Sequence, residues 1–161
     1  MSYSPLIAGA LAGFVATAPM TAAMEAMHRR LPAAERYPLP PSEITEQIEA
    51  AAGARRRIDE PEHVAASLVT HFAVGTAAGG LYGPLAAGLR PNPLLGGVAF
   101  GLAVWATGYL GVLPALDLLR PATEHPPRRN ALMITAHVVW GATLGVLLNR
   151  MIRPGRPVYQ L

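Results

Sequence analysis

Two histidines, His71 and His137, are the residues of this sequence whose surroundings best suit chemistry. Each lies inside a long uncharged stretch, four residues before a Gly-x-x-x-Gly pair. An imidazole in apolar surroundings is costly unless it faces neighbouring helices and finds a partner there. Two neutral imidazoles that face each other can ligate one haem iron axially, and the glycines would leave space for the flat macrocycle. One interpretation of the pattern is therefore a haem b site at His71 and His137.

A second interpretation gives the same histidines a structural role. An imidazole can hydrogen-bond a hydroxyl or a carbonyl on the next helix, and nearby hydroxyls are present at Thr70, Thr76, Thr135 and Thr143. If one ancestral segment was duplicated, its histidine would occur twice. The presence of two equivalent histidines then does not by itself indicate a shared ligand. This interpretation needs no cofactor, and we adopt it as the expectation, with haem b as the alternative.

The stretches that carry these histidines contain paired glycines. Two small residues four positions apart share one helix face and let a neighbouring backbone approach closely, which is typical of helices that pack in lipid. Each of the four uncharged stretches contains such a pair: Gly9 and Gly13, Gly75 and Gly79, Gly97 and Gly101, and Gly141 and Gly145. We predict that these glycines are helix-packing positions.

Composition and hydropathy predict a helical membrane protein. Of 161 residues, 52% are hydrophobic and 14% are charged. The uncharged runs cover residues 5–24, 64–89, 91–116 and 130–149, and a helix needs about 20 residues to cross the hydrocarbon core of a bilayer. We expect an all-α, four-helix transmembrane bundle that forms a single integral membrane domain over 1–161. Its helices are expected at about 5–28, 62–89, 93–118 and 130–151.

Weak internal similarity predicts how the helices are arranged. The third stretch aligns with the first at an offset of 88 residues, which pairs Gly97 with Gly9. The fourth aligns with the second at an offset of 66, which pairs His137 with His71. Two hairpins of the same orientation would then be related by an axis along the membrane normal. We predict a bundle of two parallel-related helical hairpins.

The linker between the first two stretches has a predicted element of its own. Prolines at positions 38, 40 and 41 favour extended chain, and Ser42 is a suitable N-cap for a short helix over about 42–52. Ile44 and Ile48 fall on one face of that helix, and Gly53 ends it. We expect this helix to lie in the membrane interface.

Arginine placement predicts the orientation of the chain and its class of partner. All 13 basic residues are arginines, and nine fall in the first and third linkers, at 29, 30, 36, 55–57, 120, 128 and 129. The positive-inside rule places these linkers in the cytoplasm and both termini outside. Arginines at helix ends suit anionic lipid headgroups and, without interleaved aromatic residues, do not indicate nucleic-acid binding. The expected partners are membrane lipids and other membrane-protein subunits, or further copies of this chain.

Three short motifs resemble one known family. They are Pro38-Leu39-Pro40-Pro41 after the first stretch, Thr70-His71 within the second, and Ala136-His137-Val138-Val139-Trp140 in a last stretch that ends on arginines. These motifs resemble those of the YagU-like bacterial inner-membrane proteins. The resemblance touches most of the chain, and it implies a small multi-pass protein of the bacterial cytoplasmic membrane whose biochemical role is not settled.

Motifs for soluble enzyme chemistry are missing from the sequence. It contains no phosphate-binding Gly-Lys-Ser/Thr loop, no nucleophile elbow and no cysteine. Glu25 and Asp117 stand at the ends of apolar stretches, whereas carriers usually keep carboxylates near the middle of the membrane. We therefore expect a non-catalytic accessory or scaffold subunit of a larger membrane complex, such as an energy-transducing one. A haem b electron carrier is the first alternative, and a small-solute or proton transporter is the second.

Overall fold

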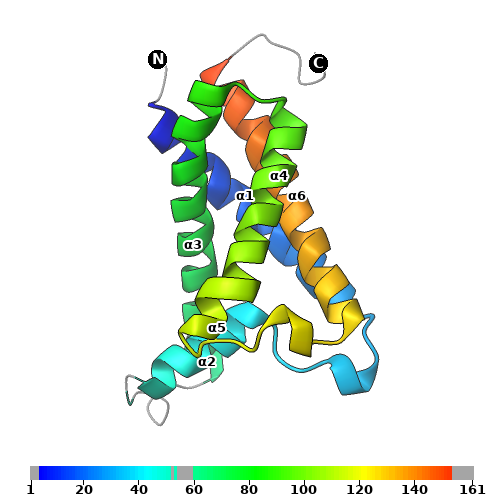
Figure 1. Ribbon diagram of the computed structural model, residues 1–161. Coiled ribbons are helices and arrows are strands. Elements are labelled where there is room, and N and C mark those ends of the chain that lie inside the picture. Colours follow the sequence, from blue (N-terminus) through cyan, green and yellow to red (C-terminus); the bar gives the residue numbers. More distant parts are fainter. Residues whose placement is uncertain (1–3, 52, 54–59, 154–161) are drawn as a thin grey trace.

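The computed structural model describes residues 4–51, 53 and 60–153, and all regular structure in these ranges is helical (Figure 1). The long helices are α1 Pro5–His28, α3 Glu60–Leu89, α4 Pro93–Thr107 and α6 Pro127–Ile152. The shorter elements are α2 Pro40–Ala51, α5 Leu113–Ala115, the 3-10 turns η1 Ala33–Glu35 and η3 Ala122–Glu124, and the π-helical turn η2 Gly108–Val112. The prediction of an all-α chain with four long apolar helices is confirmed.

Local chemistry explains where two of the long helices begin. The Ser4 hydroxyl accepts a hydrogen bond from a backbone amide of the first turn of α1, at 3.3 Å, and Pro5 occupies the first helical position. The Asn92 side chain accepts two such bonds in α4, at 3.0 and 3.1 Å, and Pro93 follows it. A capping oxygen satisfies amides that lack an intrahelical partner, and proline has no amide to satisfy.

Four helical segments in the described ranges are long and apolar enough to cross a membrane: Pro5–His28, Pro61–Leu89, Pro93–Ala115 and Pro127–Ile152. They alternate in direction along the chain. The linkers from α1 to α3 and from α4 to α6 therefore lie at one end of the molecule, and the start of α1 and the end of α6 lie at the other (Figure 1). This arrangement is consistent with a multi-pass membrane protein.

Helices α1 and α6 form the centre of the arrangement. α1 packs along α3 and along α6, and α6 also packs along α4, whereas α3 and α4 have little contact with each other. Figure 1 shows α3 and α4 in front of α1 and α6. Each of the two front helices therefore has one main partner and leaves much of its surface uncovered.

Side-chain size separates the inner face of α1 from its outer face. Over residues 5–17 the buried positions are Ala8, Gly9, Ala12, Gly13, Ala16 and Thr17. The large apolar side chains of the same segment point outward and are 46–58% exposed: Leu6, Ile7, Leu11, Phe14 and Val15. Water would meet a broad apolar patch here, whereas in lipid small residues bring helices together and large ones meet acyl chains. This distribution suits a lipid environment.

Helix α2 begins two residues earlier than the sequence predicts. The amides of Ser42 and Glu43 both donate to the Leu39 carbonyl, at 2.9 and 3.0 Å, so Pro40 and Pro41 form the first turn and Ser42 is not the cap. The physical reason is that the fixed φ of proline suits a first helical turn, where its missing amide is not needed. α2 packs against α3, and its position in the membrane interface remains a prediction.

The helix predicted over 93–118 is interrupted. α4 ends at Thr107, and the π-helical turn η2 and the short α5 follow it. Pro114 lacks an amide and its ring crowds the preceding turn, a conflict that a wider π-helical turn accommodates. Asp117 then adopts a left-handed φ of 54° and turns the chain out of the helix.

Candidate functional site

Glycine backbones meet directly between α1 and α3. A Cβ built on Gly9 would overlap the carbonyl oxygen of Gly79, and one built on Gly13 would overlap that of Gly75. A Cβ on Gly79 would in turn lie 2.7 Å from the Cα of Gly13. No side chain larger than hydrogen fits at these positions, so the two main chains are in van der Waals contact.

The same type of contact joins α4 to α6. A Cβ on Gly97 would overlap the Gly141 carbonyl and lie 2.9 Å from the Cα of Gly145. A Cβ on Gly101 would overlap the carbonyl of His137 and lie 3.1 Å from the Cα of Gly141. The structure therefore places all the glycines named from the sequence at helix–helix contacts, and it groups them into two separate seams.

The two histidines named from the sequence line one small cavity. The cavity has a volume of about 50 Å³ and lies among the four long helices. Its lining residues are Thr17, Met20, His71, Val74, Gly75, Ala78, Val104, His137 and Trp140. None of these residues is acidic, so the imidazoles are the ionisable groups of this cavity.

Hydrogen bonds assign the same tautomer to both imidazoles. Nδ1 of His137 lies 2.8 Å from the Met133 carbonyl, so it must carry the proton and donate. Nδ1 of His71 lies 3.4 Å from Oγ1 of Thr21, whose own hydrogen is donated to the Thr17 carbonyl at 2.8 Å. His71 therefore donates as well. Both rings keep the lone pair on Nε2, the atom that a metal would need.

Cavity size bears directly on what these histidines can hold. Pockets for ligands of drug size typically measure about 300–1,000 Å³, and the space between His71 and His137 is about 50 Å³. A macrocycle would enter only if α3 and α4 moved apart. As the helices stand, the cavity suits a water molecule. The bond between His71 and Thr21 of α1 fits the structural interpretation, whereas His137 bonds a carbonyl of its own helix, that of Met133.

A buried arginine at the linker end of the bundle was not predicted. Arg129 is 3% exposed, and its guanidinium donates to the carbonyls of Glu35, Tyr37 and Pro38 at 3.2, 2.8 and 2.8 Å. Its Cζ also lies 3.5 Å from the centroid of the Tyr37 ring. Arg129 therefore fastens the α1–α3 linker to the start of α6. Its partners are backbone atoms more than ninety residues away, which no sequence motif marks.

His125 joins the same cluster. Its Nδ1 lies 2.7 Å from the Tyr37 hydroxyl, and its Nε2 lies 3.2 Å from the Arg120 carbonyl. The carbonyl only accepts, so Nε2 carries the proton and Nδ1 accepts from Tyr37. Burial is the main cause that lowers the pKa of His125, and the charges of Arg129 and Arg120 lower it further, against the Arg120 carbonyl and Glu43. The imidazole is therefore held neutral.

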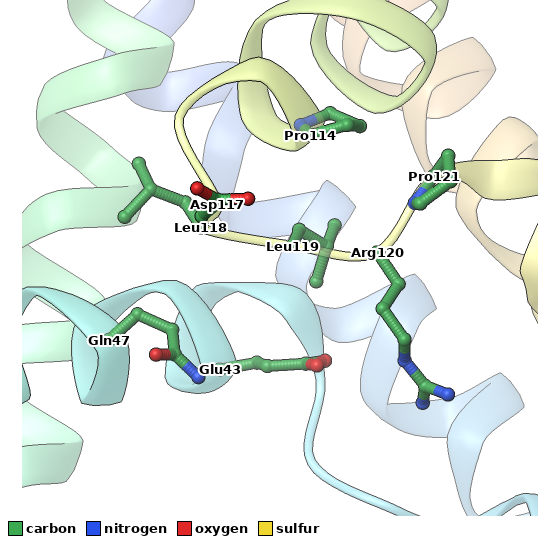
Figure 2. Close-up of a pocket in the computed structure, with 8 residues that line it drawn as sticks. All are labelled: Glu43, Gln47, Pro114, Asp117, Leu118, Leu119, Arg120 and Pro121. Atoms are coloured by element: carbon green, nitrogen blue, oxygen red, sulfur yellow. The ribbon is translucent and has the colours of Figure 1, made fainter.

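A larger pocket lies beside this cluster, between α2 and the segment that follows α5 (Figure 2). Its volume is about 370 Å³, and it is lined by Glu43, Gln47, Pro114, Asp117, Leu118, Leu119, Arg120 and Pro121. Oε2 of Glu43 is shielded from solvent and accepts no hydrogen bond from any described residue. The pocket was not predicted, because its two sides, at residues 43–47 and 114–121, are far apart in the sequence.

The fold and these sites define a class of protein: a small helical protein with four segments able to span a membrane, and with no cluster of three or more potential metal ligands in its described ranges. The chain belongs to the family of unknown function DUF6789, whose model matches residues 3–157. No curated protein and no solved structure matches the chain. An uncharacterised family is what the resemblance implied, while the YagU-like name and the bacterial inner membrane remain predictions.

Proposed function

We propose that this chain is a four-span protein of the bacterial cytoplasmic membrane, without catalytic activity of its own, that serves as an accessory or scaffold subunit of a larger membrane complex. The uneven burial of its spans carries the proposal. In the most apolar part of α6, 50% of the residues are buried within the chain, compared with 22% in α3 and 11% in the third spanning segment, Pro93–Ala115. Few residues of Pro93–Ala115 are fully covered by the chain itself, and its exposed leucines, Leu94, Leu95 and Leu110, are 45–61% accessible to other molecules.

Two uncovered glycines in η2, the turn that follows α4, favour a protein partner at this segment. A Cβ on Gly111 would meet nothing within 4 Å, and one on Gly108 would meet only the end of the Leu113 side chain, at 3.9 Å. Both glycines therefore leave main chain uncovered, in contrast to those of the two seams. Uncovered glycine backbone in an apolar helix allows a further helix to pack closely.

Purification in mild detergent tests this proposal. The tagged full-length chain is expected to recover a stoichiometric membrane protein, and Gly111→Leu is expected to lose it because the leucine blocks close approach. Gly88→Leu is the matched control, since a Cβ on Gly88 also meets nothing within 4 Å but lies near the end of α3. A protein that purifies without a partner and conducts protons or a small solute in liposomes would contradict the proposal and support the transport alternative.

Thiol labelling tests the proposed orientation, with linkers in the cytoplasm and termini outside. The chain has no cysteine, so single cysteines can report on each end of the bundle. In intact cells an impermeant thiol reagent should label Gly88→Cys and spare Glu124→Cys, which lies in η3 of the α4–α6 linker. The reverse pattern would invert the orientation.

A haem b electron carrier is the second candidate, because His71 and His137 line the same cavity and both leave Nε2 unprotonated. Protein produced with ample haem should then show a Soret band that His137→Ala abolishes. A purified wild-type protein without that band excludes this candidate. In that case His137→Ala should cost about 2–4 kcal/mol of stability, because it removes a buried side chain together with the hydrogen bond to the Met133 carbonyl.

A further inference from the structure

We propose that the pocket between α2 and the segment after α5 binds a zwitterion in which a primary ammonium stands beside a phosphate, as in an ethanolamine phospholipid headgroup. The pocket is large enough for such a group, at about 370 Å³. It also carries both signs of charge, because Glu43 and Asp117 line it together with Arg120. This inference goes beyond the proposed subunit role and rests on the membrane embedding in that proposal.

The unpartnered oxygen of Glu43 points to the ammonium half of the ligand. A carboxylate oxygen that is shielded from water and accepts no hydrogen bond is unfavourable, because its desolvation is not repaid. Oε2 of Glu43 is such an atom among the described residues. A primary ammonium has three N–H donors and a positive charge, so it would satisfy this oxygen with a charge-assisted hydrogen bond.

The opposite wall of the pocket supplies the remaining charges. Figure 2 shows Glu43 and Gln47 extending from α2, and Asp117 and Arg120 on the segment across from them. Within the part of the chain that the structure describes, the Arg120 guanidinium forms no ion pair with either carboxylate of the pocket. Its Cζ lies over the Tyr37 ring, 5.9 Å from the ring centroid. An arginine in this position is free to pair with a phosphate while the carboxylates hold the ammonium.

The height of the pocket in the bundle suits a lipid headgroup. The third membrane-spanning segment ends at Ala115, and the pocket is built from residues at and just beyond that end, from Pro114 to Pro121. Lipid phosphates and amines lie at this level when the apolar segment fills the hydrocarbon core. Pro114, Leu118 and Leu119 add apolar surface next to the charged groups.

Native mass spectrometry of the purified full-length chain tests the inference with three lipids of identical acyl chains. The ethanolamine lipid should be retained in preference to the choline lipid, whose quaternary ammonium has no N–H donor, and to the glycerol lipid, which has no cation. Glu43→Gln should weaken retention of the ethanolamine lipid about tenfold, because it removes one charge-assisted hydrogen bond. Equal retention of the ethanolamine and choline lipids by the wild type would overturn the inference.

Control variants keep the outcome interpretable. Glu25→Gln is the matched control, because Glu25 lies near the same end of the bundle and pairs with Arg29 at 2.9 Å, outside the pocket. It should keep full lipid preference. If Glu43→Gln does not fold, Asp117→Asn replaces it, since asparagine tolerates the left-handed φ of 54°. A folded Glu43→Gln or Asp117→Asn variant with unchanged preference also refutes the proposal.

Competition with soluble phosphoethanolamine distinguishes a lipid from a free zwitterion. Displacement of the ethanolamine lipid by millimolar phosphoethanolamine would show that the headgroup alone is recognised, and no displacement would assign the site to the intact lipid. Membrane embedding is tested separately, by resistance of the protein to extraction with alkaline carbonate. A carbonate-resistant protein without lipid preference refutes the headgroup site and leaves the proposed membrane function standing.

Discussion

A comparison of two glycine-to-alanine substitutions tests the seam between α4 and α6. At Gly141 an added Cβ would overlap the Gly97 carbonyl oxygen and lie 2.9 Å from its carbonyl carbon, so both main chains must move. At Gly80 the same Cβ would meet the Ala10 Cβ at 3.7 Å and the Leu6 carbonyl oxygen at 3.8 Å, and both are ordinary van der Waals contacts. The chemical change is identical at both sites, and only the surroundings differ.

The two substitutions are expected to change the free energy of unfolding in opposite directions. Separating α4 from α6 by about 1 Å forfeits part of the dispersion energy along the seam, and such overpacking costs about 1–3 kcal/mol. Alanine recovers about 0.5–1 kcal/mol of this through its better helix propensity. Gly141→Ala should therefore destabilise the protein by about 1–2 kcal/mol, and Gly80→Ala should stabilise it by about 0.5–1 kcal/mol.

Reversible unfolding in mixed micelles, with the mole fraction of sodium dodecyl sulfate as the variable and tryptophan fluorescence as the signal, measures both effects. The difference of about 2 kcal/mol corresponds to a roughly thirty-fold change in the ratio of folded to unfolded protein. Equal midpoints for the two variants would refute the claim that backbone contact holds α4 to α6.

Three further predictions follow from other contacts. Gly75→Ala would collide with the Thr17 hydroxyl, so adding Thr17→Ala should restore most of the lost stability in a double-mutant cycle. Arg129→Lys should cost about 2–4 kcal/mol in the same unfolding assay, because an ammonium cannot serve three carbonyls and stack on an aromatic ring; Arg128→Lys, at a 68% exposed side chain, should cost little. Because the folded-state pKa of His125 is lowered, its contribution is present at neutral pH and lost as the pH falls below the usual pKa of histidine; thermal melts at several pH values should show a smaller acid-side loss in His125→Gln.

The helical class was predictable because it depends on composition within single segments. Runs of about 20 uncharged residues favour helices in hydrocarbon wherever their neighbours lie. The end of α4 was less predictable, because the π-helical turn before Pro114 depends on how one ring meets the turn before it. The start of α2 at Pro40 follows the same rule of local proline geometry, applied to a first turn.

The linker-end sites were beyond prediction for a different reason. Arg129 binds carbonyl oxygens, and every residue of a chain carries one, so its partners leave no mark in the sequence. The pocket beside it is lined by both Glu43 and Asp117, and only the folded chain places α2 across from the segment that follows α5. The histidine pair could be named from sequence, but the size of its cavity depends on how four helices pack together.

The weak contact between α3 and α4 has a mechanical consequence. Main-chain contact joins α3 to α1 and α4 to α6. The chain therefore consists of two helix pairs, which meet where α1 packs against α6. Because α3 and α4 barely touch, we expect thermal motion to change the distance between them more than the distance across either glycine seam. This motion would alter the size of the cavity that His71 and His137 line.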